Sequence, residues 1–140
     1  MQAKLMIGGL AAAAVLATAA FADTVSYKAD LNGAQEVPPV AGGGTGSAEV
    51  TYDATSKQLT WKVTYSGLTG PATAAHFHGP AEAGKNAGVA VAIAGTASPL
   101  EGSATLTDAQ AADLTSGNWY VNVHTAANKS GEIRGQVVKK

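Results

Sequence analysis

Short runs of alternating apolar and polar residues dominate the chain from residue 25 onward. The clearest is LTWKVTY at 59–65, in which Leu, Trp, Val and Tyr alternate with Thr, Lys and Thr. A period of two is typical of a strand with one buried face. Similar runs lie at 25–31, 48–52, 74–78, 88–94, 103–106, 118–124 and 132–138. Short strands at this spacing predict an all-β fold, an antiparallel Greek-key β-sandwich or barrel.

One segment departs from the alternation and predicts a short crossover helix between two strands. In TDAQAADL at 107–114, Thr107 and Gln110 form a capping-box pattern, and Gly117 follows as a stop. The glycine-rich stretch at 41–46 resembles a phosphate-binding loop, but it lacks the following Lys-Ser/Thr and a helix, so we expect a flexible loop.

The first 22 residues predict a signal peptide. Lys4 precedes an uncharged, alanine-rich run, and Ala20-Phe21-Ala22 forms a cleavage site. A membrane anchor is the alternative, but the run is short and the cleavage site follows it directly. The expected organisation is a signal peptide at 1–22 and one domain at 23–140, periplasmic or secreted, with no membrane span after cleavage.

Composition narrows the function classes. The formal net charge is −1 and no basic cluster is larger than the final two lysines, which argues against a nucleic-acid partner. The chain has no cysteine, and Met1 and Met6 both lie in the expected signal. The mature domain therefore lacks disulfides and the soft sulfur ligands that some metals prefer.

Histidine supplies the candidate chemistry. The chain has three histidines, His76 and His78 in AHFHGPA and His124 in WYVNVHT. If Phe77 points into the core, alternation places His76 and His78 together on the opposite face. By the same logic His124 shares the outer face of its strand with Tyr120 and Asn122. We expect the three imidazoles to form a transition-metal site if the two strands are neighbours.

Copper is the expected metal, with zinc as the alternative. Imidazole suits both Cu(II) and Zn(II), and the general affinity order favours copper. Candidates for a fourth ligand are Glu36, Asn122, Glu132 and water. Alternation also places Arg134 on an outer face, where it either pairs with a carboxylate or guides an anion toward the metal.

Three segments carry a family resemblance. LNGAQEVPPV at 31–40 and AHFHGPA precede WYVNVHTAANKSGEIRGQV at 119–137, and together these segments resemble the CHRD domain, named for its repeats in chordin. The resemblance covers residues 23–140, and the chain is similar to exported bacterial proteins in which the CHRD domain occurs alone. It implies an extracytoplasmic β-rich domain, immunoglobulin-like or barrel-like, and does not identify a metal.

A weaker likeness is to copper–zinc superoxide dismutase, a Greek-key protein with an H-x-H pair. The histidine count and the absence of cysteine exclude its two-metal site. Three hypotheses remain. The domain binds copper for buffering, sensing or delivery; it is a mononuclear copper redox enzyme; or it is a structural or adhesive module that binds an extracytoplasmic protein or a glycan.

Overall fold

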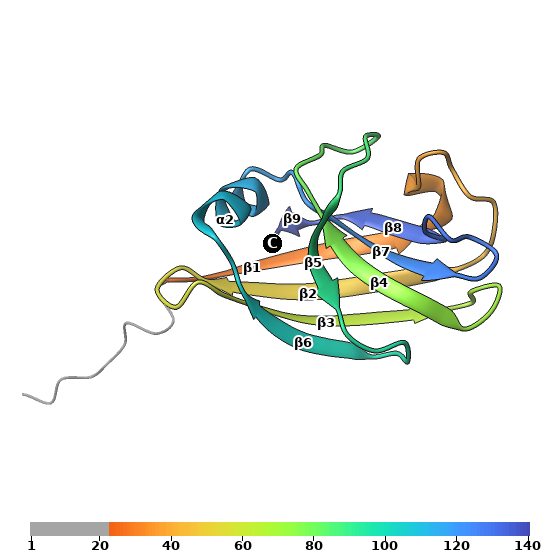
Figure 1. Ribbon diagram of the computed structural model, residues 1–140, viewed down its shortest axis with the longest axis horizontal. Coiled ribbons are helices and arrows are strands. Elements are labelled where there is room, and N and C mark those ends of the chain that lie inside the picture. Colours follow the sequence, from red (N-terminus) through yellow and green to blue (C-terminus); the bar gives the residue numbers. More distant parts are fainter. Residues whose placement is uncertain (1–22) are drawn as a thin grey trace, which may run out of the picture.

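The computed structural model describes residues 23–140, which form one antiparallel sheet of nine strands and a single α-helix (Figure 1). The strands are β1 Thr24–Asn32, β2 Thr45–Asp53, β3 Gln58–Ser66, β4 Ala72–His78, β5 Val89–Ile93, β6 Leu100–Thr105, β7 Tyr120–Thr125, β8 Ile133–Gln136 and β9 Val138–Lys139. The helices are the short 3-10 helix η1 Gly33–Gln35 and the α-helix α2 Asp108–Thr115. The expected signal peptide lies outside the described residues.

The strand order is β5-β4-β7-β8-β1-β2-β3-β6, with β9 added beside β1. Strands β1, β2 and β3 follow one another as a meander, whereas β4 pairs with β7 and β3 pairs with β6 across longer connections. The sheet curls so that its end strands β5 and β6 approach each other (Figure 1). The predicted all-β sandwich or barrel is confirmed.

The core fills the inside of this curled sheet. Trp61 of β3 and Phe77 of β4 meet edge to face at 5.4 Å between ring centroids, and Trp119 packs on Phe77 from the other side at 5.6 Å. Phe77, Val121 and Val123 are fully buried, as their strand alternation predicts. Burial of these large side chains supplies the main stabilising free energy of the domain.

Helix α2 crosses the gap between β6 and β7. Thr107 accepts a hydrogen bond from the Gln110 backbone, and the Gln110 side chain accepts one from the Thr107 backbone, so the predicted capping box is present. Leu106, which precedes the helix, and Leu114 of the helix itself are both buried in the core. The Gln110 side chain also donates to the carbonyl of Ala90 on β5, which occupies part of that open sheet edge.

The outer face of β4, β7 and β8 is partly covered, because His78, Asn122 and Arg134 are buried whereas His76 and His124 are half-buried. The loop at 79–88, between β4 and β5, contacts His78 and Arg134, and the segment after η1 places Glu36 beside Asn122. Asn86 of the loop donates to the carbonyl of Val37, which joins the two segments at 2.9 Å. This second, polar layer contains the histidines.

Candidate metal centre

Pairing of β4 with β7 brings the three histidines together. In this register His76 faces Asn122, His78 faces Tyr120, and Ala74 faces His124. Because alternate residues share a face, His76, His78, Asn122 and His124 all lie on the outer side of these two strands. The adjacency on which the sequence prediction depended is therefore present.

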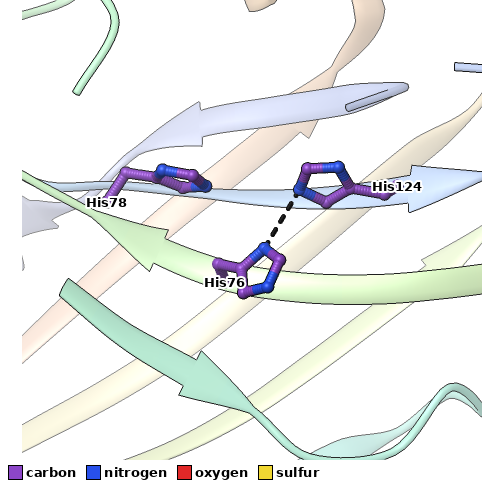
Figure 2. A group of neighbouring side chains, drawn as sticks. All are labelled: His76, His78 and His124. Carbon is purple, nitrogen blue, oxygen red and sulfur yellow. Dashed lines mark hydrogen bonds between the residues drawn. The ribbon is translucent and has the colours of Figure 1, made fainter. Parts of the chain in front are cut away.

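The imidazole nitrogens converge closely. One ring nitrogen from each histidine lies within 4.8 Å of the other two. Nδ1 of His76 is 3.1 Å from Nε2 of His124, the contact dashed in Figure 2. Four ligands on a tetrahedral metal with bonds of about 2.0 Å are separated by about 3.3 Å, so small ring shifts would accommodate an ion.

Backbone carbonyls fix which nitrogens are free. Nδ1 of His78 lies 3.0 Å from the carbonyl of Ala87, and Nδ1 of His124 lies 2.7 Å from the carbonyl of Lys129. A carbonyl only accepts, so each Nδ1 carries the proton and donates it. In the neutral rings Nε2 is then unprotonated and has a free lone pair. A hydrogen bond from Nδ1 to an outer acceptor commonly orients a histidine in this way for metal coordination through Nε2.

Both lone pairs point at the same oxygen. Oδ1 of Asn122 lies 2.9 Å from Nε2 of His78 and 3.0 Å from Nε2 of His124. The Asn122 amide nitrogen donates to the carbonyl of Ser130 at 3.3 Å, which orients Oδ1 toward the histidines. With neutral rings, three acceptor atoms therefore face one another with no hydrogen between them. A second proton on each ring, or a cation, would resolve this arrangement.

Electrostatics disfavour the extra protons. Burial lowers the pKa of His78, although the Ala87 carbonyl and the Asn122 oxygen, which would both accept from a doubly protonated ring, act in the opposite direction. Burial, followed by repulsion from His124 and His78, lowers the pKa of His76. A lowered pKa keeps these rings neutral near pH 7, the state that coordinates metals.

Tyr120 and Arg134 support the site from the side of β8. The Tyr120 ring stacks on His78 with centroids 4.7 Å apart, and the Arg134 guanidinium carbon lies 3.4 Å from the Tyr120 centroid. Arg134 donates to the carbonyl of Lys85 at 2.6 Å and to Oδ1 of Asn86 at 3.0 Å. The same loop supplies the Ala87 carbonyl that holds His78, so Arg134 anchors the segment that orients this ligand.

The proposed anion guide is thus buried, with an exposed fraction of 1%. Its hydrogen bonds to Lys85 and Asn86 and its contact with Tyr120 favour a role in holding the loop. Its role as an anion guide stays a prediction.

The candidate fourth ligands occupy different places. Asn122, 2% exposed, is the one whose oxygen lies among the imidazoles. Glu36 packs behind the Asn122 amide, where burial raises its pKa to about 7 while Arg134 and Asn122 oppose the shift. Glu132 is directed elsewhere and accepts hydrogen bonds from Thr69, Thr125 and Asn128.

Sequence reasoning missed the support of the site by the loop. Alternation predicts that an outward side chain meets solvent, whereas His78 is only 8% exposed. The covering of this face buries Glu36 and Arg134, which are residue types usually found at the surface. No periodic pattern in the sequence distinguishes them from surface residues, so the sequence alone did not indicate a covered face.

Comparison with known families agrees with the resemblance in the sequence. The family model described as CHRD domain matches residues 27–137. The chain belongs to the CHRD domain family. No curated protein and no solved structure gives a significant match. Within this CHRD domain, none of the helices at 23–140 is long and apolar enough to span a bilayer.

Proposed function

We propose that this CHRD domain binds a transition metal ion, copper, through His76, His78 and His124. The observation that carries the proposal is the convergence of Nε2 of His78 and Nε2 of His124 on the Asn122 oxygen, while carbonyls hold Nδ1 of both rings. A cation at this point replaces contacts between lone pairs with coordination bonds. Zinc is the alternative, and the affinity order of divalent ions favours copper.

The scaffold suits a preformed site. Two histidines come from β4 and one from β7, and paired strands hold side chains more accurately than loops do. The carbonyls of Ala87 and Lys129 orient two of the rings before any ion arrives. Pre-organisation of this kind lowers the entropic cost of binding.

Binding, rather than turnover, is the role that the geometry favours. A redox enzyme acting on superoxide or a related oxidant would use a cation that is free to meet an anion. Arg134 is buried and bonded to the loop instead. We propose buffering or delivery of the ion in the periplasm or outside the cell, consistent with the expected signal peptide, with an extracytoplasmic protein as the partner in delivery.

The test is a titration of the purified, metal-free protein with Cu(II) and with Zn(II), beside a His76→Ala/His78→Ala variant. A matched control is Glu101→Ala, which removes an exposed carboxylate from β6. We expect one tight equivalent in wild type and in the control, and its loss in the double variant. Intrinsic tryptophan fluorescence gives a second signal, because Trp119 packs beside Phe77, the residue between two of the ligands.

Weak binding that the double variant leaves unchanged would reject the proposal and favour the structural or adhesive module. If wild type also turned over superoxide, and His124→Ala abolished both turnover and binding, the redox enzyme would replace the buffering role.

A further inference from the structure

We propose that the Asn122 amide oxygen is the fourth ligand and makes this site selective for Cu(II) over Cu(I). One-electron reduction would then release the ion to an acceptor with sulfur ligands. The inference rests on the proposed function. It adds which oxidation state of copper the domain binds and which reaction releases the ion.

Contacts on both sides of the Asn122 amide fix its orientation. Its oxygen lies 2.9 Å from Nε2 of His78 and 3.0 Å from Nε2 of His124, within the 4.8 Å that spans the three imidazole nitrogens. Its amide nitrogen is held by the carbonyl of Ser130, so the oxygen cannot turn away without losing that bond. Asn122 is 2% exposed, and bulk water therefore has little access to this side of the site.

Gly131 makes room for this arrangement. Its φ is +124°, and a Cβ there would overlap Oε2 of Glu36 and Nδ2 of Asn122. Glu36 has an Oε2 that is buried without a hydrogen-bond partner, and it packs against the amide on the side away from the histidines. A carboxylate in this position favours the orientation in which the amide nitrogen faces it and the oxygen faces the ion.

The donor set determines the preferred oxidation state. Three imidazole nitrogens and one amide oxygen suit Cu(II), whereas thiolate and thioether sulfur select Cu(I). The sequence offers no cysteine, and its two methionines are Met1 and Met6. Residues 23–140 therefore have no soft ligand that could hold the ion after reduction.

The release step balances as a one-electron transfer. A small one-electron reductant of the enediol class loses one electron, and bound Cu(II) gains it and becomes Cu(I). The coordination bonds to nitrogen and oxygen break and each donor keeps its lone pair. His76 then takes up a solvent proton at Nδ1 and gives the proton on Nε2 to solvent, so the ring stays neutral and its hydrogen bond to His124 re-forms. Cu(I) then forms bonds to thiolate or thioether sulfur on the acceptor.

The experiment compares Cu(II) and Cu(I) affinities by competition with chelators of known strength, for wild type, Asn122→Leu and Asn122→Asp. Loss of a metal-site ligand or its support costs about 10–100-fold in affinity. We expect Asn122→Leu to lose that much for Cu(II) and less than about threefold for Cu(I). Asn122→Asp keeps an oxygen in place and should retain or increase Cu(II) affinity. A tenfold loss confined to Cu(II) raises the copper potential by about 59 mV.

The two variants separate ligation from simple support. Both lose the hydrogen bond to Ser130, so a merely structural role would weaken binding in both and for both ions. Thermal unfolding of the metal-free variants checks folding. If Asn122→Leu does not fold, the ratio of Cu(II) to Cu(I) affinity in wild type and in Asn122→Asp decides the question.

Equal affinity for the two ions in wild type, or a parallel loss in both variants, would overturn the inference and leave the three-histidine site in place. Failure of wild type to bind either ion would instead refute the proposed function itself.

Discussion

Glu36 provides a quantitative test of how the covered face is built. The residue is 6% exposed, and its pKa is raised from 4.5 to about 7, mainly because of burial. A raised folded-state pKa means that folding favours the protonated form. The contribution to stability is fully present below pH 4.5 and is lost as pH rises through 7. Glu36→Gln keeps the shape of the neutral acid and removes this dependence.

The magnitude follows from linkage. With pKa values of about 4.5 unfolded and about 7 folded, the ionisation penalty is about 0.8 kcal/mol at pH 5 and about 3.3 kcal/mol at pH 8. The stability of Glu36→Gln relative to wild type should therefore rise by about 2.5 kcal/mol between these pH values. The attraction of the ionised carboxylate to Arg134 is already included in the folded-state pKa, and any pH-independent effect of the amide cancels in that difference.

The assay is urea unfolding of the metal-free protein in a chelating buffer at pH 5, 6.5 and 8. For an m-value of about 1–3 kcal/mol/M, the midpoint difference should change by roughly 0.8–2.5 M across this range. Glu101→Gln, on the exposed edge of β6, is the matched control and should show no such trend. A pH-independent difference between Glu36→Gln and wild type would show that this carboxylate ionises as in water. It would refute the conclusion that Glu36 is shielded from solvent in the polar layer outside β4, β7 and β8.

Three further predictions concern the same layer. Gly131→Ala forces a side chain onto Glu36 and Asn122 at a φ of +124°, and we expect a loss of about 2–4 kcal/mol in unfolding free energy. Gly84→Ala, with φ +85° and open space around it, should cost only about 1 kcal/mol, and equal losses would contradict the overlap. Arg134→Lys cannot reproduce both loop bonds, so we expect about 2 kcal/mol of destabilisation and faster amide exchange at 79–88; unchanged exchange would show that the arginine does not hold the loop. Bound copper should be lost as pH falls through the lowered pKa values of His76 and His78, below the ordinary imidazole value of about 6.5, because protons compete for the ring nitrogens. Equilibrium dialysis showing full occupancy at pH 4 would argue against imidazole ligands.

The fold was predictable because its strands have clearly different faces. In β3, alternate residues are buried to nearly zero exposure and their neighbours are mostly exposed, which is the pattern that the sequence displays. The capping box of α2 is a local feature and was equally readable. The pairing of β4 with β7 was not readable, because partner choice depends on the closure of the whole sheet rather than on either strand.

The candidate site was predictable only in part. The outward direction of the three histidines follows from Phe77, Val121 and Val123, which alternate with them and are buried. The burial of Arg134 does not follow from any pattern in its own strand, because it results from a loop some 50 residues earlier. The position of Glu132 was not predictable from its strand either. It was a candidate ligand, but its carboxylate accepts hydrogen bonds from Thr69, Thr125 and Asn128 instead.

Pairing of β4 with β7 also has a consequence for chain topology. The ligands His76 and His124 are 48 positions apart in the sequence, so an ion held between them ties two distant points of the chain together. A covalent cross-link closing a loop of that length would stabilise a fold by about 4 kcal/mol, in the chain-entropy description. In a chain with no cysteine, a bound metal ion would act as a reversible cross-link. Binding or release of the ion would then raise or lower the unfolding free energy of the whole domain.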